Sequence, residues 1–142
     1  MARVLAVDPG ERRVGVAVSD PSGTVAQPVG FVAADPVTSL PERLALMASE
    51  HEAEALVVGL PRRLDGSEGP EARAARALAR RLRELTRLPV SLIDERLSSV
   101  AAERALVAAG EKRARRRRLS DQVAAALILQ QHLDVQKRLG GP

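Results

Sequence analysis

The stretch LAVDPGERRVGVAVSD (residues 5–20) holds two short apolar runs on either side of a polar turn. Residues 4–8 and 14–20 are rich in β-branched side chains, and the PGERR segment between them has the proline and glycine of a tight turn, which predicts a β-hairpin. The first run ends at Asp8, with Pro9 and Gly10 directly behind it. We therefore expect a strand whose last residue presents a carboxylate at the point where the chain turns.

After this hairpin the sequence alternates between strand and helix patterns. Residues 24–34 form a third apolar run, in which Pro28 favours an edge strand because proline has no N–H to donate to a sheet. The remaining expected elements are a helix over 37–51, a strand over 55–61, a helix from Pro70, a strand over 89–94, a helix from Ser98 or Ser99 to about Ala109, and a helix from Asp121, capped by Ser120, to about Lys137. Strands that alternate with helices pair in parallel, so residues 1–142 are expected to form one α/β domain.

Acidic residues fall at the carboxyl ends of the expected strands, where ligands gather in open α/β sheets. Asp8 ends the first strand, and Asp94 and Glu95 stand at the end of the last one. With a strand order of 3-2-1-4-5, a single strand would separate these two ends, and two strand spacings span roughly 10 Å.

Asp121 is expected on the sheet-facing side of the last helix. It shares a helix face with Ala125 and Ile128, and the small residues Ala124 and Ala125 would let the helix approach the sheet closely. The ordinary role of an acid in the first turn of a helix is to complement the helix dipole. That alternative stays open on the residues alone.

A cluster of carboxylates is costly unless a cation lies between them. Cysteine is absent and the only histidines are His51 and His132, so carboxylate oxygens are the expected ligands, and such ligands suit Mg²⁺ or Mn²⁺. A pair of such ions about 4 Å apart binds a phosphodiester, orients an attacking water and stabilises the leaving oxygen.

No apolar run approaches the roughly 20 residues of a membrane span, and the start lacks signal-peptide features. We expect a cytoplasmic protein with no membrane partner.

Basic residues point to nucleic acid as the partner. Arginine makes up twenty of the 22 basic residues, and its planar fork suits phosphate. Residues 111–118, EKRARRRR, carry six positive charges and one negative; such a run is often only solvated, but as a flexible loop before Asp121 it would attract a nucleic-acid backbone. Phe31 is the single aromatic residue, so recognition should depend on backbone and shape rather than on base stacking. The candidate binding residues are Arg12, Arg13, Arg62, Arg63, Ser67, Arg96, Lys112, Arg113, Arg115, Arg116, Arg117 and Arg118.

Four segments, LAVDPGERRVGVAVSD, VVGLPRRLDGSEG, IDERLSS and LSDQVAAALILQ, together resemble the YqgF family. These are RuvC-like members of the ribonuclease H-like fold, described as Holliday junction resolvases and as nucleases that mature the 5′ end of pre-16S ribosomal RNA. The resemblance implies a five-stranded mixed sheet of order 3-2-1-4-5 and a metal-dependent nuclease. It also implies that Asp8 is the first-strand acid, Glu95 the second acid and Asp121 the last-helix acid.

This chain departs from the wider superfamily at the fourth strand. Many ribonuclease H-like nucleases carry an acid at the end of that strand, where this chain reads VGLP (58–61). The role passes to Glu95 or to Asp94 on the neighbouring strand. Glu95 is preferred, because Asp94 alternates inward with Leu92 and would have to turn at the strand end to reach a metal.

Several functions remain open at this point. The favoured one is an endonuclease acting on the ribosomal RNA precursor, for which a monomer suffices. Cleavage of a four-way DNA junction is the alternative within the same chemistry, and it needs two coordinated cuts and hence a homodimer. A nucleotide-binding module, or a nucleic-acid-binding protein without catalysis, is the alternative from another class.

Overall fold

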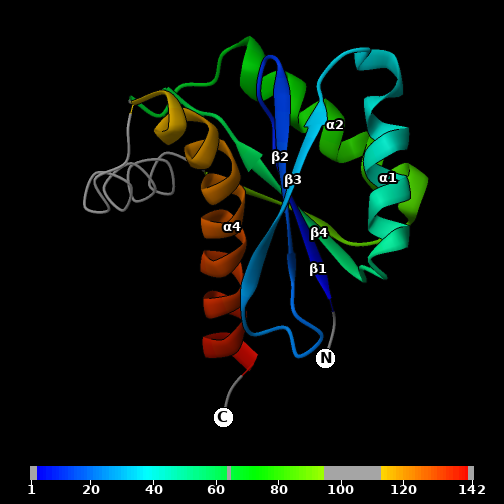
Figure 1. Cartoon of the computed structure of the whole chain (residues 1–142). Helices are drawn as coiled ribbons and strands as arrows, with labels where there is room; N and C mark the ends of the chain where they lie inside the picture. Colours follow the sequence, from blue (N-terminus) through cyan, green and yellow to red (C-terminus); the bar gives the residue numbers. More distant parts are fainter. Residues whose placement is uncertain (1–2, 64, 95–112, 141–142) are drawn as a thin grey trace.

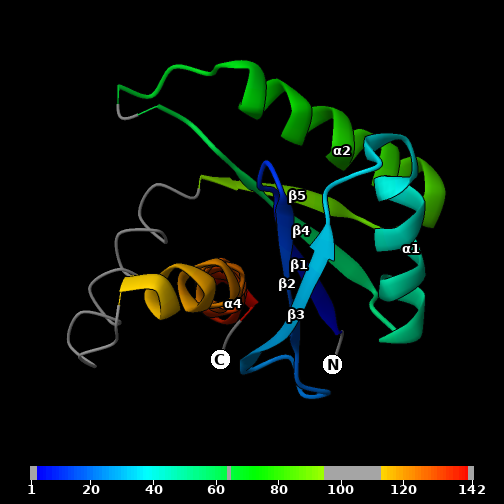
Figure 2. The ribbon, with the colours of Figure 1, turned by 45° about the horizontal axis from the view of Figure 1, so that its top comes forward.

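The computed structural model describes residues 3–63, 65–94 and 113–140. They form a sheet of five strands in the order β3-β2-β1-β4-β5, which confirms the order expected from the sequence. Helix α4 covers one face of the sheet, and helices α1 and α2 cover the other (Figures 1 and 2). The helix expected between residues 98 and 109 lies outside the described residues.

The sheet begins with the predicted hairpin. Strand β1 (Val4–Asp8) pairs antiparallel with β2 (Arg13–Ser19), and β2 pairs antiparallel with β3 (Ala26–Ala33), the edge strand expected from Pro28. A register shift after Val16 makes a bulge in β3, where Gly30 adopts a φ of 143° that favours glycine. On its other side, β1 pairs in parallel with β4 (Ala55–Leu60), and β4 in parallel with β5 (Val90–Asp94).

Helices α1 (Leu40–Glu50) and α2 (Pro70–Thr86) bury regularly spaced apolar side chains against one face of the sheet. A short 3₁₀ turn (Val37–Ser39) leads into α1, and α2 has its proline in the first turn, where the missing N–H costs no helical hydrogen bond. Leu85, in the last turn of α2, has a side chain that is 36% exposed.

Helix α4 (Arg113–Gly140) packs across β1, β2 and β3 and also contacts β4. Its contribution to the core is Ala125, Ile128, Leu129 and Leu133, which meet Val4, Ala6, Ala17 and Val57 of the sheet. The side-chain amide of Gln130 adds two hydrogen bonds to the start of β3: its oxygen accepts from the Ala26 N–H at 2.9 Å, and its nitrogen donates to the Thr24 carbonyl at 3.0 Å. The apolar contacts determine which face of α4 meets the sheet, and the Gln130 side chain determines where α4 lies along β3.

The expected start of this helix was wrong. The basic segment was expected as a loop ending in a Ser120 cap, whereas α4 begins at Arg113 and contains Ser120. Arginine, alanine and leucine favour the helix, and no glycine or proline lies between residues 113 and 139 to stop it. Among the helices of residues 3–63, 65–94 and 113–140, none is long and apolar enough to cross a membrane.

Candidate active site

Asp8 ends β1 on the face of the sheet that α4 covers. Side chains alternate along a strand: Val4 and Ala6 belong to the cluster beneath α4, whereas Leu5 and Val7 belong to the cluster beneath α1 and α2. Asp8 is therefore on the α4 face, and it is half-buried there. The strand end presents a carboxylate, as expected from the sequence.

Glycines flank Asp8 on both neighbouring strands. Gly15 of β2 is its cross-strand partner. On the other side, Val7 pairs with Val58 of β4, so that Gly59 is the next residue along that strand. The two positions directly opposite Asp8 on the adjoining strands are thus both glycine. No acid stands in β4, so Asp8 is the acid of the two central strands, β1 and β4.

The turn behind Asp8 is tightly built. A Cβ atom at Gly10 would collide with the backbone carbonyl oxygen of Arg13, and the Arg12 carbonyl accepts a hydrogen bond of 2.9 Å from the Ala34 N–H. Arg13 opens β2 two residues before Gly15, on the α4 face, and its guanidinium lies over the Phe31 ring, 4.7 Å from the ring centroid. No sequence pattern connects Phe31 with the site; the pairing of Gly15 with Phe31 across β2 and β3 brings the ring there.

Asp94 belongs to the opposite face. It alternates with Val90 and Leu92, which pack in the cluster beneath α1 and α2, and this is the alternation expected from the sequence. Its carboxylate lies 3.8 Å from the Arg62 guanidinium. Asp8 and Asp94 thus lie two strands apart, on opposite sides of the sheet.

Arg62 is part of a chain of ion pairs that ties the loop between β4 and α2 to its surroundings. Besides Asp94, it approaches Glu68 at 3.5 Å. Glu68 receives two hydrogen bonds of 2.7 Å from Arg76 of α2, a bidentate pair that lowers the pKa of Glu68 and raises that of Arg76. The Arg62 Nε is buried and has no hydrogen-bond partner among the residues the structure describes.

The same loop contains two further predicted binding residues. Ser67 donates its N–H to the Asp65 carboxylate at 2.8 Å, and the hydrogen bond from its side chain lowers the pKa of Asp65. The Arg63 guanidinium packs over Gly69, where a Cβ atom would lie 2.8 Å from its Nη2. In this structure both residues make contacts within the loop between β4 and α2.

For the other predicted site residues, the structure describes either no atoms or only the backbone. Glu95, Arg96 and Lys112 are not among residues 3–63, 65–94 and 113–140. For Asp121, Arg113 and Arg115–Arg118 the structure gives the backbone in α4 but not the side chains. Ala125 and Ile128, which share the helix face of Asp121, are both fully buried against the sheet. Within the described residues, no three His, Cys, Asp or Glu side chains are grouped so that they would hold a metal ion.

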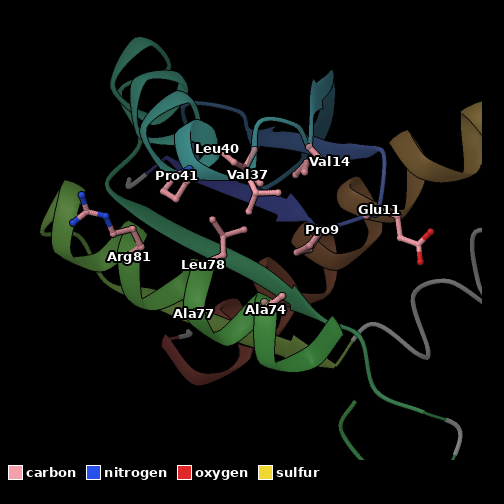
Figure 3. Close-up of a pocket in the computed structure, with 13 residues that line it drawn as sticks. Pro9, Glu11, Val14, Val37, Leu40, Pro41, Ala74, Ala77, Leu78 and Arg81 are labelled. Carbon is pink, nitrogen blue, oxygen red and sulfur yellow. The ribbon is translucent and has the colours of Figure 1, made fainter. Parts of the chain in front are cut away.

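An apolar cavity of about 420 Å³ lies on the face opposite Asp8. Figure 3 shows its lining, to which Pro9 of the turn, Val37 of the 3₁₀ turn and Leu78 of α2 contribute. The acidic residue of the lining is Glu11, at the rim of the turn. This cavity is separate from the carboxylate on the α4 face.

A family model, RuvX, described as Holliday junction resolvase, matches residues 2–135. A protein of Ruegeria sp. (strain TM1040) named "Putative pre-16S rRNA nuclease" is 45% identical over 94% of this chain and 85% of its own length. One of the same name from Paracoccus denitrificans (strain Pd 1222) is 46% identical over 96% of this chain and 87% of its own.

Two solved structures share the fold at low sequence identity. Thermus thermophilus RuvC, in complex with Holliday junction substrate, has a TM-score of 0.64 at 18% identity and covers 99% of this chain and 97% of its own. The fowlpox virus Holliday junction resolvase has a TM-score of 0.59 at 8% identity and covers 94% of this chain and 99% of its own.

Sheet order and structural likeness define a ribonuclease H-like fold of the RuvC type. The chain belongs to the RuvX family, which confirms the resemblance to YqgF proteins. The enzyme class expected from the sequence, a nuclease, is confirmed with it.

Proposed function

We propose that residues 1–142 form a single-domain, cytoplasmic, metal-dependent endonuclease that processes the 5′ end of pre-16S ribosomal RNA. The names of relatives that are 45% and 46% identical over more than nine-tenths of the chain support this substrate. The structural observation that carries the chemistry is Asp8, a half-buried carboxylate at the carboxyl end of the central strand, flanked by Gly15 and Gly59.

Asp8, Glu95 and Asp121 would hold Mg²⁺ or Mn²⁺. Their oxygens are the ligands such ions prefer. The bound ions would polarise the scissile phosphate and lower the pKa of the attacking water. Asp94 is the weaker candidate because it lies on the face of the sheet opposite Asp8, where its carboxylate pairs with Arg62.

The protein's own residues would bind and orient the substrate backbone. Arg13 lies on the α4 face beside the turn that follows Asp8. Arg113 and Arg115–Arg118 belong to the first turns of α4, the helix that also carries Asp121. Contacts of this kind neutralise phosphates without reading bases and make binding strongly salt-dependent.

Cleavage of a four-way DNA junction is the second candidate, favoured by the description of the family. The chemistry at Asp8 would be the same. The difference lies in assembly, because resolution of a junction needs two coordinated cuts and therefore two copies of the chain, whereas a monomer can trim RNA.

The test is cleavage of two labelled substrates, one with the precursor 5′ region of small-subunit ribosomal RNA and one a four-way DNA junction. Each is incubated with Mn²⁺ or with excess chelator. Wild type is compared with Asp8→Asn and with Asp94→Asn, a matched loss of one carboxylate on the opposite face. We expect Asp8→Asn to lower the rate at least about 100-fold, since the loss of an outer-shell partner alone costs 10–100-fold, and Asp94→Asn to retain most activity.

Metal-dependent cutting of the RNA alone would support the processing nuclease. Paired symmetric cuts in the junction alone, with a dimer in sedimentation, would establish the second candidate instead. Equal activity of Asp8→Asn and wild type would refute the assignment of Asp8, and strong loss in Asp94→Asn alone would move the second ligand to Asp94.

A further inference from the structure

The single aromatic residue of the chain lies in line with Asp8. Asp8 of β1 pairs with Gly15 of β2, and Gly15 pairs with Phe31 of β3. Cross-strand partners point to the same face of a sheet, so the three residues form one row on the α4 face. Since Gly15 has no side chain, the carboxylate and the ring are the side chains of this row on β1, β2 and β3.

Arg13 occupies the face of that ring. Its guanidinium carbon lies 4.7 Å from the Phe31 centroid, within the range of a cation–π contact. Arg13 itself is exposed, whereas Phe31 is half-buried. A long exposed arginine samples many rotamers, and stacking on a fixed ring reduces that freedom before any ligand arrives.

The surface beside this stack is hollow. A depression of about 570 Å³ is lined, among the described residues, by Gly10, Glu11, Arg12 and Arg13. Two cations and one anion give this lining a positive balance. The depression lies at the turn that directly follows Asp8, the last residue of β1.

We propose that Arg13, held in place by Phe31, binds a backbone phosphate of the substrate adjacent to the one that is cleaved, and that Phe31 is a positioning residue for this contact. The inference rests on the proposed nuclease function and deepens it. Arg13 would offer its planar fork to two phosphate oxygens. Arg12, one residue earlier, belongs to the turn rather than to β2 and is not needed for this contact.

The experiment measures binding without cleavage, in chelator, of the labelled ribosomal RNA fragment and of the four-way junction across a series of salt concentrations. Arg13→Ala should weaken binding about tenfold and reduce the slope of log affinity against log salt by about one. Arg12→Ala removes the same charge one residue away and should change both quantities less. Phe31→Leu should weaken binding about two- to fivefold, and Phe31→Tyr should restore it.

A double-mutant cycle tests the coupling. Phe31→Leu should have no further effect once Arg13 is alanine, and in a cleavage assay it should raise KM with little change in kcat. Thermal unfolding of each variant checks that the fold is retained. An equal effect of Phe31→Leu with and without Arg13, or equal effects of Arg12→Ala and Arg13→Ala, would overturn the proposal.

The two proposals fail separately. Arg13-dependent binding by a protein that cuts neither substrate would retain this inference and remove the nuclease assignment. Metal-dependent cleavage with an unchanged KM and salt slope in Arg13→Ala would retain the nuclease and remove this inference.

Discussion

Replacing Ala125 by leucine tests whether the close approach of α4 to the sheet sets the geometry of the site. Ala125 is fully buried, and so are Ala6 and Ala17 in the strands beneath it. A leucine adds three carbon atoms to a contact from which solvent is already excluded. Either α4 moves away from the sheet, or side chains leave their preferred rotamers.

Overpacking of this kind costs about 1–3 kcal/mol of unfolding free energy, which for a chain of this length lowers the melting temperature by about 2–12 °C. The catalytic rate should fall much further. Asp121, which we propose as a metal ligand, lies one turn before Ala125 on the same helix, and a misplacement of about 1 Å at a catalytic group costs about 100-fold. We therefore expect a folded, moderately destabilised protein with about 1% of the wild-type rate.

The assay combines urea unfolding, followed by circular dichroism, with single-turnover cleavage. Leu129→Ala is the matched control: Leu129 is fully buried on the same helix, and its truncation costs about 3–5 kcal/mol by leaving a void rather than by pushing α4 outward. Val135→Ala, at a position that is 42% exposed, should change little. If Ala125→Leu keeps the full rate, or if Leu129→Ala loses as much rate while still folded, the reasoning is refuted.

Three further changes probe the turn behind Asp8 and the edge of the sheet. Gly10→Ala puts a Cβ atom against a backbone carbonyl and should cost about 1–3 kcal/mol in urea unfolding and lower the cleavage rate. Hydrogen bonds from the Ser22 hydroxyl and from backbone N–H groups lower the pKa of Asp20 from 3.8 to about 2. Asp20 therefore stabilises the fold above its ordinary pKa, and this contribution is lost as the pH falls toward 2. In Asp20→Asn the melting temperature should fall less steeply over that pH range. Gln130→Ala removes two hydrogen bonds to the start of β3 and should cost about 1–2 kcal/mol, with faster hydrogen exchange there.

Each of these predictions has a contradicting result. Unchanged stability of Gly10→Ala would mean that the turn relaxes around the new methyl group. Identical pH profiles for wild type and Asp20→Asn would remove Asp20 from the acid response. Slow exchange at the start of β3 in Gln130→Ala would show that pairing with β2 alone protects that strand.

The order of strands and helices could be predicted because each element has its own local pattern of apolar residues and turn signals. The β-branched apolar runs at 4–8 and 14–20, the strand pattern at 55–61 and the helix start at Pro70 are local signals, and the structure has a strand or helix at each of them. The start of α4 was missed for an equally local reason. Ser120 has the chemistry of a cap, but nothing before it stops a helix of arginine and alanine.

The candidate site was likewise predictable only in part. The position of Asp8 at a strand end and the inward alternation of Asp94 depend on one strand each and were predictable. The stacking of Arg13 on Phe31 and the pairing of Arg62 with Asp94 depend on contacts between elements. Register across β2 and β3 includes a bulge after Val16, and a one-residue difference there would move Phe31 to the other face.

Because Phe31 is the single aromatic residue, its position is suited to a fluorescent probe of the site. The chain contains no tryptophan and no tyrosine, so its intrinsic fluorescence is very weak. Phe31→Trp would keep a ring beneath Arg13 and would make residue 31 the sole fluorophore, in the same row as Asp8. Quenching or a spectral shift on adding a metal ion or an oligonucleotide would then come from this one place, with no dye attached and no background to subtract.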